Sequence, residues 1–153
     1  MMTLRTAAPP DHARILDVMP AWWGGRDLRA LVPSLFLEHF AGTSLVAEAD
    51  GELAGFLIGF VSQDRPDEAY VHMIGVDPAR RGDGLGRRLH DEFADLVRER
   101  GVRRIRCVTS TVNTASVAFH TSIGFVVTGT GVPVEARGLE ADADGHVLMC
   151  REI

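Results

Sequence analysis

The sequence predicts an α/β (α+β) fold built on one mixed, mostly antiparallel twisted sheet of about seven strands, with four helices on both faces. One observation is that apolar residues alternate, or run without a break, in several short segments. A second is that apolar residues recur every three or four positions in other segments. A third is the order of the segments: hairpins come first and crossover helices follow, so one sheet must hold antiparallel and parallel pairs.

The N-terminal part of the chain alternates between the two periods. The predicted elements are, in order, a strand at 3–7, a helix at 11–19, a loop at 20–27, a helix at 28–40, and strands at 43–49, 52–63 and 69–76. Asp11 and Asp27 are candidate N-caps of the two helices. Prolines and glycines break the helical pattern between them, and Asp50-Gly51 is a two-residue hairpin signal.

The C-terminal part alternates helix and strand. Its predicted elements are a helix at 85–100, a strand at 102–110, a helix at 113–123, a strand at 125–131, an irregular acidic connection at 132–145 and a strand at 146–153. Gly101 ends the first of these helices, and Thr111 or Asn113 caps the second. No repeat or linker interrupts the chain, so we expect a single domain over residues 1–153.

Charge is distributed unevenly along the chain. The formal net charge of −5 argues against broad binding of nucleic acid or of an anionic membrane. All 16 basic residues are arginines, and most of them lie between residues 80 and 106. Such a local basic patch suits a compact polyanionic ligand better than a nucleic-acid duplex.

Several other features bear on compartment and chemistry. No apolar run reaches the roughly 18 residues of a membrane helix, and the N-terminus lacks a signal-peptide pattern, so a cytoplasmic location is expected. Cys107 and Cys150 fit neither a metal-binding spacing nor a disulfide framework. We expect two reduced, buried cysteines and no metal site. Four histidines are expected at exposed or edge positions without a functional role: His12, His39, His90 and His146.

A glycine-rich turn carries the strongest chemical signal. Gly82, Gly84 and Gly86 follow the strand at 69–76 and introduce the helix at 85–100. The first amides of a helix have no intrahelical partner, the helix dipole is positive there, and glycines let these amides approach a phosphate. Four neighbouring arginines add positive charge: Arg80, Arg81, Arg87 and Arg88. We therefore expect a phosphate-bearing cofactor at this turn.

Two common phosphate-binding motifs do not fit. In the dinucleotide fingerprint G-x-G-x-x-G, the last glycine would stand three residues after Gly84, where this chain has Arg87. No acidic residue with the ribose-binding role follows a second parallel strand at the expected spacing. The P-loop and the kinase glycine loop both need a lysine, and this chain has none.

The residues Arg81-x-x-Gly84-x-Gly86, after Ile74-Gly-Val-Asp-Pro78, resemble the acetyl-CoA pyrophosphate loop of the GNAT superfamily of N-acetyltransferases. Further along, Asn113-x-x-Ala-x-x-Phe119-His-x-x-x-Gly-Phe125 resembles the second cofactor motif of that superfamily. The element order agrees over essentially all 153 residues. The resemblance implies a GNAT-like sheet, splayed between the strands at 69–76 and 102–110, with the pantetheine arm of acetyl-CoA in the gap.

The resemblance also implies cofactor contacts. Amides of the glycine turn would hold the pyrophosphate, and the main chains of Ile74 and Val76 would pair with the pantetheine arm. An amide near Ile74 or Gly75 would polarise the thioester carbonyl. Asn113 can cap its helix and contact the cofactor as well. The candidate cofactor-binding residues are Ile74, Gly75, Val76, Arg81, Gly82, Asp83, Gly84, Leu85, Gly86, Arg87, Asn113, Ser116 and Phe119.

The candidate catalytic residues are His120 and His72. Many members of the superfamily use a tyrosine at the position of His120 to protonate the leaving thiolate. Here an imidazolium could supply that proton, or the imidazole could bond the sulfur. His72 stands at a position that serves as the base in some relatives, and Glu68 is the alternative, although we expect it in a solvated turn. Tyr70, His72 and Ile74 share one strand face unless a bulge intervenes.

The candidate substrate-binding residues are Trp22, Trp23 and Tyr70, which by analogy lie where the acceptor enters. The leading hypothesis is an acetyl-CoA-dependent N-acetyltransferase in which a primary amine of a small molecule or peptide attacks the thioester directly. Two alternatives are a non-catalytic acyl-CoA-binding domain, suggested by the missing tyrosine, and an NAD-dependent oxidoreductase. A homodimer, common in the superfamily, could form through edge strands and the 131–145 connection.

Overall fold

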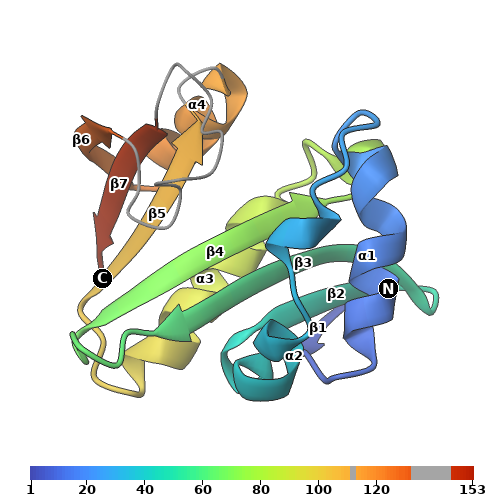
Figure 1. Ribbon diagram of the computed structural model, residues 1–153, viewed down its shortest axis with the longest axis horizontal. Coiled ribbons are helices and arrows are strands. Elements are labelled where there is room, and N and C mark those ends of the chain that lie inside the picture. The colour runs from blue at the N-terminus through green and yellow to red at the C-terminus, as the bar shows by residue number, and fades with distance from the viewer. Residues whose placement is uncertain (111–112, 132–145) are drawn as a thin grey trace.

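Seven strands form one sheet, in the order β1-β2-β3-β4-β5-β7-β6, in the computed structural model of the chain (Figure 1). The structure describes residues 1–110, 113–131 and 146–153, so the predicted connection at 132–145 lies outside the described residues. The neighbours pair antiparallel except β4 and β5, which are parallel, and the predicted mixed sheet is confirmed. The strands are β1 (Met2–Thr6), β2 (Leu45–Ala49), β3 (Glu52–Val61), β4 (Glu68–Val76), β5 (Arg104–Ser110), β6 (Val126–Gly131) and β7 (His146–Glu152).

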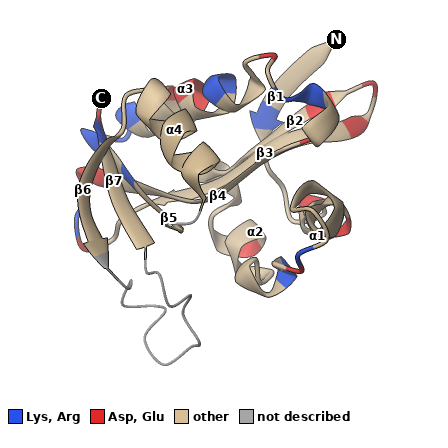
Figure 2. Ribbon diagram, turned by 90° about the horizontal axis from the view of Figure 1, so that it is seen from above, with Lys and Arg blue, Asp and Glu red and all other residues tan. Residues whose placement is uncertain are grey.

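Helices cover both faces of this sheet (Figure 2). On one face lie α1 (Asp11–Trp22) and α2 (Leu35–His39), and on the other lie α3 (Leu85–Arg98) and α4 (Thr114–Ser122). Phe56 of β3 packs in the cluster of α1, whereas its neighbour Leu57 packs in the cluster of α3, because successive strand residues point to opposite faces. In the described part of the chain, no helix is long and apolar enough to cross a membrane.

The segment between α1 and β2 differs from the prediction of one helix over 28–40. A 3-10 turn spans Arg29–Leu31, and α2 begins only at Leu35. Pro33 explains the break, because proline has no amide hydrogen and keeps the residue before it out of the helical region. That residue, Val32, has φ −124° and ψ 70°.

The predicted loop at 20–27 is also shorter than expected, because α1 continues through Pro20 to Trp22. The helix ends where Gly24 (φ 64°) and Gly25 (φ 89°) adopt left-handed conformations that other residues disfavour. Trp22 is therefore the last residue of a helix, and Trp23 caps it.

β4 and β5 pair along only part of their lengths. Their parallel register runs from Glu68–Arg104 to Val71–Cys107, and within the described ranges the half of β4 after Val71 has no partner on that side. The two strands diverge from this point (Figure 1), as the predicted splay requires. An unpaired strand edge inside a fold offers main-chain groups that a ligand can bond.

Candidate active site

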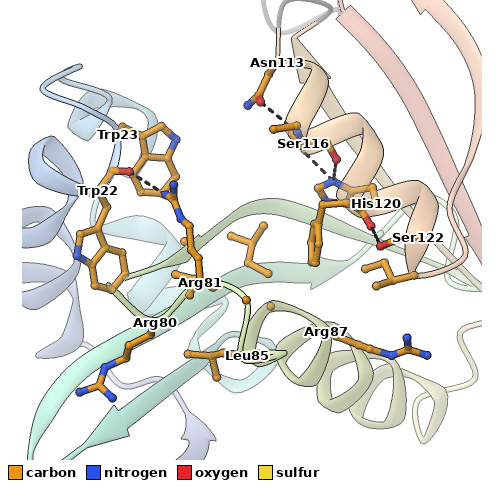
Figure 3. Close-up of a pocket in the computed structure, with 18 of the residues that line it drawn as sticks. Trp22, Trp23, Arg80, Arg81, Leu85, Arg87, Asn113, Ser116, His120 and Ser122 are labelled. Carbon is orange, nitrogen blue, oxygen red and sulfur yellow. Dashed lines mark hydrogen bonds between the residues drawn. The ribbon is translucent and has the colours of Figure 1, made fainter. Parts of the chain in front are cut away.

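A cavity of about 860 Å³ lies where β4 and β5 diverge (Figure 3). The end of α1, the turn between β4 and α3, and one side of α4 line it. Three predicted site residues are absent from its walls: Tyr70, His72 and Asp83. The predicted site residues that do line it are Trp22, Trp23, Ile74, Gly75, Val76, Arg81, Gly82, Gly84, Leu85, Gly86, Arg87, Asn113, Ser116, Phe119 and His120.

The register between β3 and β4 determines which main-chain groups of β4 face the cavity. The Asp77 amide donates a hydrogen bond of 2.9 Å to β3. Hydrogen-bonded positions alternate in an antiparallel pair, so Gly75 and Phe56 form the next bonded pair. The N–H and C=O groups of Ile74 and Val76 therefore point away from β3, toward the gap. Of the two amides predicted to polarise a carbonyl, this geometry favours that of Ile74.

The glycine turn presents backbone amides at the start of α3. The helix begins at Leu85, and its first backbone hydrogen bond runs from the Arg88 amide to the Gly84 carbonyl, over 3.0 Å. The amides before Arg88 have no intrahelical acceptor, and the helix dipole adds positive character to them. Gly82 (φ 90°) and Gly84 (φ 80°) adopt left-handed conformations, which explains the glycines at these positions.

The glycine turn can bind a phosphate group, and the cavity beside it can hold an organic group attached to that phosphate. A Cβ at Gly86 would lie 2.9 Å from Cζ of Phe119, so glycine is what lets α3 approach α4 this closely. Four arginines line the same cavity and add charged donors to the backbone amides of the turn: Arg26, Arg80, Arg81 and Arg87. The apolar walls continue from there toward β4.

Asn113 is the N-cap of α4 and is one of the two caps predicted for this helix; the other, Thr111, lies outside the described residues. Its side-chain oxygen accepts a hydrogen bond of 3.1 Å from the Ser116 amide. The Ser116 hydroxyl in turn lies 3.1 Å from the Thr109 hydroxyl of β5. These bonds fix the first turn of α4 against the sheet at the edge of the cavity. Asn113 therefore has a structural role whether or not it contacts a cofactor.

His120 of α4 is buried, and its tautomer follows from one hydrogen bond (Figure 3). Nδ1 lies 2.7 Å from the Ser116 carbonyl oxygen, which can only accept, so Nδ1 carries the hydrogen and Nε2 keeps a lone pair in the neutral ring. The rings of Phe119, His90 and Phe125 surround the imidazole at centroid distances of 5.1, 5.2 and 5.3 Å. Burial lowers the pKa of His120 below its ordinary 6.5, against the opposing effect of the Ser116 bond. The structure therefore favours a neutral imidazole over the imidazolium acid considered from the sequence.

His90 of α3 is fully buried, and the prediction of an exposed or edge position is wrong. Neither ring nitrogen has a hydrogen-bond partner within the described part of the chain. Burial, followed by the charges of His120 and Arg151, lowers the pKa of His90 to about 3. The sequence did carry a signal, since His90 precedes the buried residues Phe93 and Val97 by three and seven positions, on the apolar stripe of the helix.

A β-bulge in β4 separates His72 and Tyr70 from the cavity. The pairing of β3 with β4 shifts at His72, which has no partner in the register. Its Nε2 donates to the Leu31 carbonyl over 2.6 Å, and its ring stacks on Phe36 at 4.4 Å, on the α2 side. Tyr70 stacks on an aromatic ring of β3 on the same side. Ile74 packs against the α3 side instead, so the shared face expected for the three residues is interrupted.

Glu68, the alternative base, does not lie in a solvated turn. It is the first residue of β4, it is 7% exposed, and its carboxylate accepts hydrogen bonds from Arg106 (3.1 and 3.2 Å) and Arg104 (3.4 Å). Burial alone would raise the pKa of Glu68, but the arginines outweigh it and the pKa lies below its ordinary value. A carboxylate paired in this way is a weak proton acceptor.

The splayed strand pair, the amide-rich turn at a helix N-terminus and the cavity between them define an acetyltransferase of the GNAT type. Residues 12–125 match the family model described as the acetyltransferase (GNAT) family. The chain therefore belongs to the GNAT acetyltransferase family, as the resemblance of its motifs predicted. Acetyl-CoA, the predicted co-substrate, is the acetyl donor of this family.

Individual relatives are similar to this chain over most of its length. The L-2,4-diaminobutyric acid acetyltransferase of Nocardia farcinica is 33% identical over 70% of this chain and 58% of its own length. The enzyme of the same name from Streptomyces coelicolor is 37% identical over 73% of this chain and 71% of its own. The structure of Ard1 from Thermoplasma volcanium superposes with a TM-score of 0.79, at 25% identity, over 99% of this chain and 97% of that one. The chain thus spans little more than half the length of the Nocardia relative.

Proposed function

We propose that this chain transfers the acetyl group of acetyl-CoA to the primary amine of a small, amino-acid-like molecule. The observation that carries the proposal is that one cavity joins the unpaired main chain of β4 to the amide-rich turn before α3. The relatives named as diaminobutyric acid acetyltransferases support a small acceptor that carries an amine. The net charge of −5 favours the approach of a cationic amine.

In the proposed arrangement, different residues around the cavity bind different parts of acetyl-CoA. The amides of the glycine turn, with Arg81 and Arg87, hold the pyrophosphate. Ile74 and Val76 bond the pantetheine arm as a neighbouring strand would, and Phe119 forms the opposite wall. The first turn of α4, with Asn113 and Ser116, contacts the arm from that side. When bound, acetyl-CoA supplies an activated acetyl thioester.

The chemistry then needs one polarised carbonyl and one proton transfer. The Ile74 amide donates to the thioester carbonyl oxygen as negative charge develops on it. The amine nitrogen bonds the carbonyl carbon, the carbon–sulfur bond breaks, the nitrogen loses a proton and the thiolate gains one. Nε2 of His120, which holds a lone pair, accepts this proton and returns it to the sulfur. We propose that His72 removes the first proton, the one that converts the ammonium form of the acceptor into a neutral amine. Because His72 lies outside the cavity, a water molecule would carry this proton to it.

Calorimetric titration of the protein with acetyl-CoA, with NADH as the control, tests the cofactor site. Micromolar binding of acetyl-CoA alone supports the proposal, and binding of NADH alone would favour the oxidoreductase hypothesis. A panel of amines, led by L-2,4-diaminobutyric acid and including a polyamine and a short peptide, is then assayed for thiol release. Tight binding without turnover would favour the second candidate, a non-catalytic acyl-CoA-binding domain, which the histidine at position 120 motivates.

The assembly state and the cellular location follow from separate measurements. β6 is an edge strand whose Val126 and Val127 are 61% and 52% exposed, which supports pairing with a second copy there. Sedimentation velocity at micromolar concentration distinguishes the predicted homodimer from a monomer. Fractionation of the cells that express the chain tests the predicted cytoplasmic location.

A further inference from the structure

The last turn of α1 is bonded to the glycine turn across the cavity (Figure 3). Nη2 of Arg81 donates a hydrogen bond of 3.1 Å to the Trp22 carbonyl oxygen, which joins residues 59 positions apart. The last carbonyls of an α-helix have no intrahelical donor, and α1 has no basic residue in its own last turn. Arg81 therefore supplies both a donor and a positive charge to the C-terminus of this helix.

This end of α1 is built from residues with unusual backbone properties. Pro20 lies inside the helix and has no amide hydrogen, and Gly24 and Gly25 follow the helix in left-handed conformations. The backbone closes the turn through the Gly25 amide, which donates to the Pro20 carbonyl over 2.7 Å. Within this segment, the Arg81 bond is the side-chain link between the helix end and the cofactor loop.

The two tryptophans of this segment pack on the sheet beside the place where acetyl transfer is proposed: Trp22 on β3, and Trp23 on β3 and β4. Trp22 and Trp23 both contact Phe56, each at a ring centroid distance of 6.0 Å. A Cβ at Gly75 would lie 2.7 Å from Cη2 of Trp23, so the indole rests directly on the backbone next to Ile74. A shift of the helix end would move both indoles over this backbone.

We propose that Arg81 is a positioning residue for the acceptor site as well as an anion-binding residue for the cofactor. A guanidinium has five N–H donors, so Arg81 can keep the Trp22 carbonyl and bond a phosphate at the same time. A phosphate on the loop then fixes the guanidinium, and through it the end of α1, so that Trp23 stays over Gly75. The inference rests on the proposed function, because it takes the tryptophans to line the acceptor's entrance.

Tryptophan fluorescence tests the contact without any turnover. The chain has two tryptophans, both in this segment, so intrinsic tryptophan emission reports on this place alone. Arg81→Gln removes the bond, and Arg87→Gln is the matched control: it removes a charge from the same turn, and the Arg87 guanidinium faces Asp91 at 3.8 Å. We expect a red-shifted emission and stronger acrylamide quenching in Arg81→Gln, and wild-type values in Arg87→Gln. Equal spectra and quenching for the two variants would overturn the proposal.

Steady-state kinetics tests the acceptor role. Both glutamine variants should weaken acetyl-CoA binding, because each removes one positive charge from the turn. At saturating acetyl-CoA, only Arg81→Gln should raise the acceptor KM. We expect an increase of about tenfold, which is the effect of losing one charge-assisted hydrogen bond. Arg81→Lys should raise the acceptor KM less than Arg81→Gln does, because lysine keeps the positive charge. An unchanged acceptor KM would overturn the acceptor role even if quenching rises. If the wild-type protein acetylates no amine, the proposed function fails, whereas the fluorescence still decides whether Arg81 holds Trp22.

Discussion

By the resemblance of the second cofactor motif, His120 takes the position of a tyrosine that many members of the superfamily use, and its hydrogen bond determines what it can do. The Ser116 carbonyl holds the Nδ1 hydrogen, so the neutral ring offers Nε2 as an acceptor only. Burial lowers the pKa of His120, which keeps the ring neutral at physiological pH. A residue in this state can take a proton from the reacting amine and pass it on, but it does not start the reaction as an acid.

We expect His120→Phe to lower kcat by about tenfold or more and to leave the acetyl-CoA affinity nearly unchanged, because a positioned proton acceptor is lost while an aromatic ring still fills the position. In the wild-type enzyme, kcat should fall as the pH drops through a value below 6.5, where the imidazole becomes protonated. The variant should lack this acidic limb. The exposed His39→Phe serves as the control. An identical pH profile in wild type and His120→Phe would refute the role.

Neither ring nitrogen of His90 has a hydrogen-bond partner in the part of the chain that the structure describes, so His90→Leu should raise the free energy of unfolding by about 1 kcal/mol or more at pH 7. The gain should grow as the pH falls. The folded-state pKa of about 3 lies below the unfolded value near 6.5, so in the wild type the unfolded chain binds the proton first and stability is lost below pH 6.5. Urea denaturation at pH 7 and pH 5 measures both effects. A less stable variant would mean that packing around the imidazole outweighs its desolvation.

At the scale of the elements, the junction between β4 and α3 can be tested with two matched glycines. Gly84 (φ 80°) starts α3 and Gly101 (φ 87°) follows its end, and a Cβ at either position would meet no atom within 4 Å. Both Gly→Ala changes should therefore cost about 1–2 kcal/mol of stability through backbone strain. Only Gly84→Ala should also weaken acetyl-CoA binding, by about tenfold, because it displaces the amides of the turn. Calorimetric titration of both variants with acetyl-CoA measures the difference. Equal acetyl-CoA affinities for the two variants would show that the turn is not part of the cofactor site.

The N-terminal end of α1 is held by a buried carboxylate. Asp11, the first residue of the helix rather than its N-cap, accepts hydrogen bonds from Arg5 (2.9 and 3.0 Å), Arg14 (3.1 Å) and the Ala8 amide (2.9 Å). Burial alone would raise the pKa of Asp11, but these bonds outweigh it and the pKa lies below its ordinary value. The carboxylate therefore connects α1 to β1 most strongly in its charged form.

Asp11→Asn should lower the free energy of unfolding at pH 7 by about 2 kcal/mol, less than a fully buried pair would lose because both arginines are partly exposed. The difference should shrink at acidic pH. A depressed folded-state pKa adds stability above the unfolded value near 3.9, and this stability disappears as the pH falls through the folded value. Denaturation at pH 7 and pH 3 measures it. Asp27→Asn, in an exposed pair with Arg29, should have no measurable effect.

The elements were predictable where the local pattern is strong. The long apolar run of β3 and the apolar stripe of α3 are properties of nearby residues in the sequence, and both elements appear within a few residues of their predicted limits. The helix predicted at 28–40 failed because its apolar spacing is helical while Pro33 forbids helix continuation. The sequence left open whether a bulge interrupts β4 near His72, because a bulge depends on how β3 and β4 pair, and no local residue encodes that pairing.

At the scale of the whole molecule, the sequence predicted the glycine turn, which forms one wall of the cavity, better than it predicted the contacts between distant segments. The glycine turn is a contiguous motif, so its residues could be found by reading along the chain. The bond from Arg81 to Trp22 and the burial of His90 beneath α4 arise only when distant segments meet. Such long-range contacts determine the protonation states of the buried histidines and the positions of the tryptophans. The sequence left both points open.

The gap between β4 and β5 leads to a prediction for the whole fold. Acetyl-CoA in this gap should connect the two halves of the sheet and stabilise the protein by about 2.7 kcal/mol at a ligand concentration one hundred times Kd. Amide hydrogen exchange followed by NMR should slow at Ile74 or Val76, whose main-chain groups face the gap. The Gly75 amide should change least, because the register directs it to Phe56 of β3. Protection of Gly75 without its two neighbours would mean that the register, and with it the proposed path of the pantetheine arm, is wrong by one residue.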